Sequence, residues 1–209
     1  YIALPNSMHY DFIIKCIDAK KKILVEKPAT KNFLEIKSIK EKYNINKFFY
    51  SEGFMYFHHP QILDVIQILK KGLIGNLITI KSKFGNNILK KKNFLGKEIL
   101  KKQDIKNRLF NKDLGGGVIL DLGCYPTSFC ILVASLYFDL DINKIKVNIN
   151  SKQFGTTGVE IDSSASIKFN DTINAEVETS FIRDIGYESE IIGDKGKILI
   201  RDTWQGSSY

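Results

Sequence analysis

A lysine between a carboxylate and a proline follows a short apolar run near the N-terminus. Residues 25–30 read V-E-K-P-A-T. Proline fixes the backbone and has no amide hydrogen, so it would hold the Lys27 side chain in one direction. A lysine at the end of a buried strand can donate to a substrate oxygen and stabilise developing negative charge, and burial would lower its pKa toward proton exchange. The alternative is an exposed Glu26–Lys27 pair of little consequence.

An aspartate and a tyrosine four residues apart form a second candidate site. Asp121 and Tyr125 have apolar neighbours, and on a helix this spacing puts both side chains on one face. A phenol near an ammonium group can act as a general acid or base, and a carboxylate can orient the pair. Pro126 removes one helical hydrogen bond, so we expect a kink there. A hydrogen-bonded core aspartate beside an interior tyrosine is the alternative.

Three consecutive glycines, Gly115 to Gly117, precede that aspartate. They could form an anion-binding nest of backbone amides. No Lys-Ser or Lys-Thr pair follows them, which argues against the phosphate loop of nucleotide hydrolases. Close approach of the backbone to a ligand or to the sheet is the favoured interpretation.

The histidines and cysteines do not have the spacing of metal ligands, so the sequence predicts no metal site. The cysteines are also too few and too scattered for a disulfide framework, which favours a reducing cytoplasm. These residues are His9, His58, His59, Cys16, Cys124 and Cys130.

Strands and helices alternate in the first quarter of the chain. Apolar runs at residues 1–4, 23–25 and 47–51 alternate with amphipathic patterns at residues 8–20 and 33–43. This alternation predicts a parallel sheet covered on both faces, with a ligand crevice at the carboxyl ends of its strands. Three polar positions follow these strands: Asn6, Glu26–Lys27 and Glu52.

The second amphipathic helix has a predicted inner side and a predicted cap. Thr30 or Asn32 would cap its N-terminus. The residues expected to face the core are Phe33, Leu34, Ile36, Ile39 and Tyr43.

The remaining sequence predicts a mixed α/β second part. A helix over residues 60–71 leads into a strand over 77–84, and a lysine-rich excursion over 85–111 is a candidate lid. An apolar helix over 114–135 follows. Alternating segments with two hairpins then occupy residues 146–200, which predicts a large, mostly antiparallel sheet with helices on one side.

We therefore expect an α/β fold made of two domains. Residues 1–53 would be the C-terminal part of a Rossmann-type parallel sheet, without the glycine-rich turn that normally opens it. That half would take about 60 residues, so we expect a truncated start. Residues 54–209 would form an α+β domain, which also looks cut short at Ser207–Tyr209.

Composition places the chain among ordinary globular proteins. Its 209 residues are 44% hydrophobic and 26% charged, with a net charge of +8. No apolar run reaches the roughly 20 residues of a membrane helix, and no signal peptide is visible. The positive charge comes almost entirely from lysine, whereas nucleic-acid recognition favours arginine, so a nucleic-acid partner is not predicted. Salt-dependent binding to DNA would revive that alternative.

Four segments, in this order, resemble the Gfo/Idh/MocA family of oxidoreductases. The E-K-P alone is a weak match, but its combination with G-G-G-x-x-x-D-x-G-x-Y is specific, and the resemblance covers nearly the whole chain. The matching segments are residues 1–9 (Y-I-A-L-P-N-S-M-H), 26–28 (E-K-P), 52–56 (E-G-F-M-Y) with His59-Pro60, and 115–126 (G-G-G-V-I-L-D-L-G-C-Y-P).

The resemblance implies a Rossmann domain that binds NAD or NADP, followed by a substrate domain. It implies that Lys27 lies beside the nicotinamide and the substrate hydroxyl, and that Asp121 and Tyr125 are the other catalytic residues. The Tyr-Pro version is most similar to the dihydrodiol dehydrogenase and xylose dehydrogenase branch. The residues implied on the cofactor side are Pro5, Asn6, His9, Glu26, Lys27 and Pro28.

The function expected from this resemblance is hydride transfer between NAD(P) and a hydroxyl-bearing carbon of a sugar, cyclic polyol or dihydrodiol. The expected assembly is a cytoplasmic homodimer or homotetramer formed through the antiparallel sheet. Phe57 and His58 depart from relatives, which often have an arginine and an aromatic residue there, so the substrate stays open. A non-catalytic sensor that binds a dinucleotide is the alternative, against which the retention of Lys27, Asp121 and Tyr125 argues.

Overall fold

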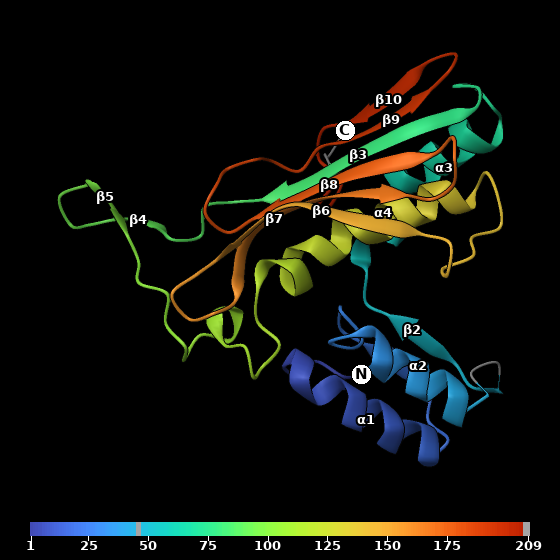
Figure 1. Cartoon of the computed structure of the whole chain (residues 1–209). Coiled ribbons are helices and arrows are strands. Elements are labelled where there is room, and N and C mark those ends of the chain that lie inside the picture. The colour runs from blue at the N-terminus through green and yellow to red at the C-terminus, as the bar shows by residue number, and fades with distance from the viewer. Residues whose placement is uncertain (45–46, 207–209) are drawn as a thin grey trace.

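The computed structural model describes residues 1–44 and 47–206, so the last three residues discussed above, Ser207–Tyr209, lie outside the described part. A small parallel sheet with two helices forms the N-terminal part, and a six-stranded sheet with two further helices forms most of the rest (Figure 1). The predicted α/β class is confirmed.

The N-terminal part contains α1 (Asn6–Asp18), β1 (Ile23–Val25), α2 (Phe33–Lys42) and β2 (Tyr50–Glu52). Strand β1 pairs in parallel with β2, and Ile2 forms a parallel bridge to Val25. Three chain segments therefore run in the same direction, as the alternation of elements predicted, and their carboxyl ends lie at one edge. Strand β2 begins three residues later than expected, because residues 47–48 form a turn.

The helices cover this small sheet differently from the prediction, which placed helices on both of its faces. Ile23 and Val25 are buried against α1 and α2, whereas Leu24, which points to the opposite face, is 43% exposed. In the described part of the chain, the helices cover one face of β1 and β2 rather than both. The alternation of elements predicts crossovers but does not determine how many helices each face receives.

Helix α2 is capped as predicted but buries fewer residues than expected. The Asn32 side chain accepts a hydrogen bond from the Glu35 amide, and the Glu35 carboxylate accepts one from the Lys31 amide. Phe33 and Leu34 were expected to face the core, yet they are 56% and 73% exposed. The helix contacts the core along a narrow stripe that includes the partly buried Ile36 and Tyr43 and the fully buried Ile39.

The second part is built on one mixed sheet with strand order β10-β9-β3-β8-β7-β6. All neighbouring pairs are antiparallel except β3 and β8, and both predicted hairpins are present. Its strands are β3 (Leu77–Gly85), β6 (Lys146–Phe154), β7 (Glu160–Lys168), β8 (Asn174–Ser180), β9 (Ser189–Gly193) and β10 (Lys197–Ile200).

Helices α3 (Pro60–Lys70) and α4 (Cys124–Ser135) cover one face of this sheet, as predicted (Figure 1). A short 3-10 helix, η2 (Met55–His58), leads into α3. The core between the layers is rich in aromatic side chains, and its largest fully buried members are Trp204, Tyr56 and Phe129.

Buried tyrosines make the fold sensitive to alkaline pH. Burial raises the pKa of Tyr50 and Tyr56 above the ordinary value of about 10. A raised folded-state pKa means that the unfolded chain loses these protons first, so the associated stability is intact below about pH 10 and falls above it. We expect the unfolding free energy to drop above pH 10 by up to about 1.4 kcal/mol per pH unit for each such tyrosine. Urea unfolding of Tyr56→Phe should show a shallower alkaline decline than the parent, and identical slopes would contradict this.

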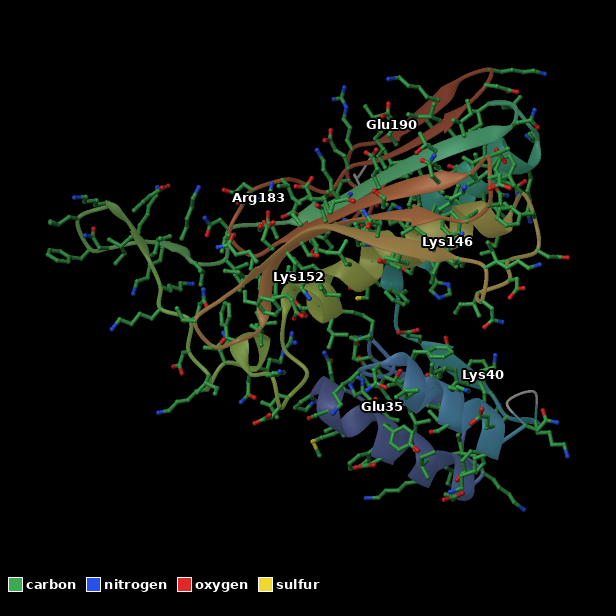
Figure 2. All side chains as sticks on the ribbon, viewed as in Figure 1. Glu35, Lys40, Lys146, Lys152, Arg183 and Glu190 are labelled. Atoms are coloured by element: carbon green, nitrogen blue, oxygen red, sulfur yellow. The ribbon has the colours of Figure 1, made fainter. Side chains whose placement is uncertain are left out.

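Residues 86–114 leave the sheet, a segment that includes nearly all of the excursion predicted over residues 85–111. The sequence did not predict the short hairpin of β4 (Lys90–Lys92) and β5 (Glu98–Leu100). This hairpin projects from the body, and its side chains extend outward (Figure 2). Phe94 at its turn is 95% exposed. Few tertiary contacts hold the hairpin, so its strands have no buried face that could produce an alternating pattern.

The helix after the three glycines begins as a π-helix. The segment η4 (Ile119–Gly123) has π-helical hydrogen bonding and continues directly into α4. Pro126 has no amide hydrogen to donate to the Leu122 carbonyl, so regular α-helical bonding cannot extend through this point. The π-helix ends three residues before this proline; such segments are frequent at functional sites, and the kink expected at Pro126 stays a prediction.

Within residues 1–44 and 47–206, no helix is long and apolar enough to cross a bilayer. The same described residues contain no group of three or more histidine, cysteine or acidic side chains arranged to hold a metal ion.

Candidate active site

Lys27 and Asp121, 94 positions apart in the chain, meet at the junction of the two parts of the molecule. The Lys27 Nζ atom lies 2.6 Å from the Asp121 carbonyl oxygen and 3.3 Å from Asp121 Oδ1. Only 16% of the Lys27 side chain and 14% of the Asp121 side chain are exposed. The alternative of a solvated Glu26–Lys27 surface pair is therefore wrong. Lys27 is instead a largely buried ammonium group with a carboxylate partner.

The Tyr125 ring lies next to the ammonium group of this ion pair. Lys27 Nζ is 4.9 Å from the centre of the Tyr125 ring, a distance at which the cation is attracted to the ring face. The ring is 7% exposed and packs edge-on against Phe54 and Phe84. Among the described residues, no hydrogen bond to the Tyr125 hydroxyl is found, which leaves this group available to a ligand.

Burial raises the pKa of two side chains at the start of helix α4, Tyr125 and Cys124. It raises the pKa of the Tyr125 hydroxyl above its ordinary value, and the nearby Cys124, Glu26 and Asp121 act in the same direction. Burial also raises the pKa of the Cys124 thiol to about 12, so this cysteine is protonated at neutral pH and is a poor nucleophile.

Arg108 is a site residue that the sequence analysis missed. It lies in the short helix η3 (Arg108–Phe110), at the end of the lysine-rich excursion. Arg108 Nη1 is 3.3 Å from Asp121 Oδ1, so one carboxylate oxygen receives two cations. The Arg108 side chain is 57% exposed. It is the single arginine among residues 85–114, and that was the only feature in the sequence that could have indicated it.

Arg108→Ala should weaken the orientation of Asp121 without abolishing the site. An ion pair this exposed contributes about 0.2–1 kcal/mol. We therefore expect turnover to fall about two- to fivefold, measured as kcat on the intact protein. Lys106→Ala, two residues away on the same excursion, is the control and should leave kcat unchanged. An equal effect of the two variants would contradict a specific contribution of Arg108.

The glycine turn brings Arg108 and Asp121 together. The amides of Gly115, Gly116 and Gly117 donate to the carbonyl oxygens of Lys112, Asn111 and Leu109, respectively. With all three amides occupied, the anion nest considered above is excluded. The predicted close approach of the backbone is present: Gly116 lies against the 108–111 backbone, and Gly117 lies against Glu160, the first residue of the sheet strand β7. A Cβ atom on Gly116 would lie 2.5 Å from the Arg108 carbonyl oxygen.

Gly116→Ala should therefore destabilise the protein and displace Asp121. The methyl group meets three backbone carbonyl oxygens, which cannot move as a flexible side chain can. We expect a loss of about 1–3 kcal/mol in the free energy of unfolding. Gly196→Ala is the matched control, because its nearest neighbours would lie at 3.9 Å or beyond. Equal midpoints of urea unfolding for the two variants would show that the turn is not tightly packed.

The residues implied on the cofactor side have different environments. The Asn6 side chain donates to the Gly115 carbonyl oxygen at 2.9 Å, and the turn formed by Pro5 and Asn6 therefore lies against the glycine turn. Glu26 is half-buried and accepts a hydrogen bond from the Tyr1 hydroxyl. Pro28 is buried and follows a cis peptide bond.

His9, also implied on the cofactor side, is a buried residue whose role there stays a prediction. Its side chain is fully buried, and its two ring nitrogens lie 2.9 Å and 2.8 Å from the carbonyl oxygens of Pro28 and Leu4. The ring thus has no free polar atom for a ligand and lies behind the loops that line the crevice. The structure consequently brings together Lys27, Asp121 and Tyr125 at the site, with His9 behind them.

The molecule consists of a parallel β/α unit followed by a mixed sheet that helices cover on one face, and polar residues lie where the two meet. This arrangement defines a two-part α/β protein of the Rossmann-containing class. Two family descriptions match the chain: "GFO/IDH/MocA C-terminal domain" over residues 62–199, and "Oxidoreductase family, NAD-binding Rossmann fold" over residues 1–54. The chain belongs to the GFO/IDH/MocA family, as its motifs indicated.

Similar proteins share modest sequence identity with the chain. The trans-1,2-dihydrobenzene-1,2-diol dehydrogenase of Xenopus tropicalis is 25% identical over the whole chain and 57% of its own length. A dTDP-3,4-didehydro-2,6-dideoxy-alpha-D-glucose 3-reductase of Actinomadura kijaniata is 30% identical over 68% of the chain and 37% of its own length. The matched part of the chain thus spans 57% and 37% of the lengths of these two relatives.

Solved structures share the fold. An aldose-aldose oxidoreductase from Caulobacter crescentus, complexed with glycerol, matches all of this chain and 57% of its own with a TM-score of 0.78 and 18% identity. A 3-ketoreductase from Actinomadura kijaniata in complex with TDP-benzene and NADP has a TM-score of 0.73 and 21% identity, covering 98% of this chain and 57% of its own.

Proposed function

We propose that the intact protein is an NAD(P)-dependent oxidoreductase. It would transfer a hydride between the nicotinamide and a hydroxyl-bearing carbon of a sugar, cyclic polyol or dihydrodiol. The observation that carries this proposal is the meeting of Lys27, Asp121 and Tyr125, which come from a strand end and a distant helix. The relatives named above, a dihydrodiol dehydrogenase and a sugar reductase, support the substrate class.

The proposed roles follow from the chemistry of the three side chains. In the reduction direction, Tyr125 donates the proton that the substrate oxygen requires, and its raised pKa keeps that proton in place. Lys27 donates a hydrogen bond to the same oxygen and stabilises its negative charge. Asp121 fixes the Lys27 ammonium through its carbonyl and carboxylate oxygens.

The residues present fit a bound nicotinamide cofactor. The carboxyl ends of three parallel segments meet at the site, which is where dinucleotides bind in sheets of this kind. In the reduction direction, the ammonium and phenol groups would both donate hydrogen bonds to the substrate carbonyl oxygen, which makes its carbon a better hydride acceptor. We propose that Pro5, Asn6, Glu26, Lys27 and Pro28 line the cofactor, with His9 supporting them from behind. The bound nicotinamide would supply or accept the hydride; NADP is the cofactor in the ketoreductase structure.

A cofactor absorbance assay on the intact protein tests this function. Purified protein is mixed with NADH or NADPH, or with the oxidised forms, and a panel of sugars, cyclic polyols and dihydrodiols. We expect a substrate-dependent absorbance change with at least one member. Cofactor binding without turnover across the whole panel would instead favour the non-catalytic sensor.

The domain division is also a proposal. Residues 1–53 would bind the dinucleotide, and residues 54–209 would bind the substrate and form the oligomer. Separate apolar cores support this division, one centred on Ile13, Val25 and Ile39 and the other on Trp204 and Phe129.

We further propose a homodimer or homotetramer formed through the face of the six-stranded sheet that the helices leave uncovered. A hollow of about 460 Å³ lies on this face, lined by side chains of both charges that include Lys81, Glu176 and Glu190. Light scattering of the purified protein would test this assembly, and a monomer at micromolar concentration would contradict it. A cytoplasmic location agrees with the three unpaired cysteines.

A further inference from the structure

The peptide group that follows Lys27–Pro28 is held from both sides by side chains. Its carbonyl oxygen, on Pro28, lies 2.9 Å from Nδ1 of His9. Its amide, on Ala29, donates to Oε1 of Glu52 at 2.7 Å. Both contacts involve one planar peptide unit, so together they fix its position and its rotation about the chain.

The two side chains come from different elements. His9 belongs to α1 and is fully buried, and Glu52 is the last residue of β2. Nε2 of His9 lies 2.8 Å from the Leu4 carbonyl oxygen, so the ring also ties the turn to the first parallel segment. A ring that carries protons on both nitrogens donates to both carbonyl oxygens.

The pKa of Glu52 depends on its burial and on its two neighbours at this peptide, Ala29 and His9. Burial raises the pKa of Glu52, whereas the hydrogen bond from the Ala29 amide and the charge of His9 lower it. Protonated or ionised, the side chain retains an oxygen that accepts from Ala29. A glutamine at this position would do the same, whereas an apolar side chain would leave the amide without its partner.

We propose that His9 and Glu52 are positioning residues that act as a two-sided clamp on the Pro28–Ala29 peptide and thereby fix Lys27. Neither side chain touches the reacting groups in this arrangement. Lys27 is separated from the clamped peptide by one residue, Pro28, whose ring restricts the backbone. Movement of the clamped peptide therefore moves the Lys27 stem, and a displacement of about 1 Å at a reacting group can cost about 100-fold in rate.

The expected effect of the clamp on catalysis rests on the proposed function. The position of Lys27, in contrast, can be measured without any assumption about activity. Lys27 is protected by its contacts with Asp121, so its amine should react slowly with an acylating reagent. Lys144, which is 80% exposed, provides an internal reference in the same sample. The ratio of the two labelling rates, measured by mass spectrometry of peptides, reports the position of Lys27 without any turnover.

Three variants and one control distinguish the effect of losing the clamp from the effect of a general loss of stability. His9→Phe keeps a ring but removes both ring nitrogens, and Glu52→Met removes the acceptor at similar length. Glu52→Gln keeps the acceptor. Ile39→Val is the control, because it weakens the same core at a fully buried residue of α2 and leaves both side chains of the clamp in place.

In His9→Phe and Glu52→Met we expect the relative labelling of Lys27 to rise at least fivefold. In the intact enzyme kcat should fall about 10- to 100-fold while the affinity for the cofactor changes little. Glu52→Gln and Ile39→Val should match the parent in both measurements. If His9→Phe does not fold, the Glu52→Met and Glu52→Gln pair tests the clamp alone.

Unchanged Lys27 labelling in folded His9→Phe and Glu52→Met would overturn the clamp, whatever the activity. Equal increases in labelling in the Ile39→Val control would also overturn it, since the effect would then reflect loss of stability. If the parent protein shows no turnover but the labelling follows the expected pattern, the clamp holds and the proposed enzymatic function fails.

Discussion

Lys27→Met in the intact protein should lower kcat by about 1,000-fold while cofactor binding remains measurable. Methionine preserves the length and most of the volume of the lysine stem, so the turn around Pro28 should keep its shape. The substitution removes the ammonium group that lies 2.6 Å from the Asp121 carbonyl oxygen and 4.9 Å from the Tyr125 ring. Among the described residues, no other cationic side chain is found in contact with both Asp121 and the Tyr125 ring.

The measurement is steady-state turnover together with cofactor binding followed by fluorescence. Lys37→Met is the matched control, because Lys37 is 53% exposed and pairs with Glu41 one helical turn away. This control should retain full activity. Normal turnover of the Lys27→Met enzyme would refute the role of this lysine, and a parallel loss of cofactor binding would indicate a binding role instead of a chemical one.

Tyr125→Phe should reduce kcat by about 100- to 1,000-fold with little change in thermal stability. The substitution removes one oxygen atom that has no hydrogen-bond partner among the described residues. The ring can keep its contacts with Phe54, Phe84 and Trp204, so the core should be unaffected. A large loss of rate without a loss of stability would be the expected signature of a proton donor.

The pH dependence provides a second check on Tyr125. Because burial raises the pKa of its hydroxyl, the phenol keeps its proton up to and beyond pH 10. Reduction by the parent enzyme should therefore show no loss from tyrosine ionisation below pH 10. Tyr10→Phe, which removes a hydroxyl that bonds Ser38 outside the site, is the control. Comparable rates for the Tyr125→Phe and parent enzymes would exclude the phenol as the acid.

Most of the fold could be predicted from local patterns. The alternation of strand and helix in residues 1–53 and the two hairpins after residue 146 follow from hydrophobic periodicity and turn residues, and both are present. The cap at Asn32 follows from the preference of an amide side chain for that position. These features depend on neighbours within a few positions, so the sequence contains the information directly.

The sequence also determined which residues could do chemistry at the site. A lysine held before a proline, and an aspartate and a tyrosine four positions apart on an apolar helix, are recognisable because their function requires particular types at particular spacing. The ion pair between Lys27 and Asp121 is consistent with this reading.

Only the tertiary structure decided how distant segments meet. The return of the 85–114 excursion places Arg108 on Asp121, the glycine amides are used by the 109–112 carbonyl groups, and His9 and Glu52 hold opposite ends of one peptide. Each of these contacts joins side chains or backbone groups whose pairing leaves no periodic pattern along the chain. Their partners are set by tertiary packing within each part of the molecule, which local preference cannot encode.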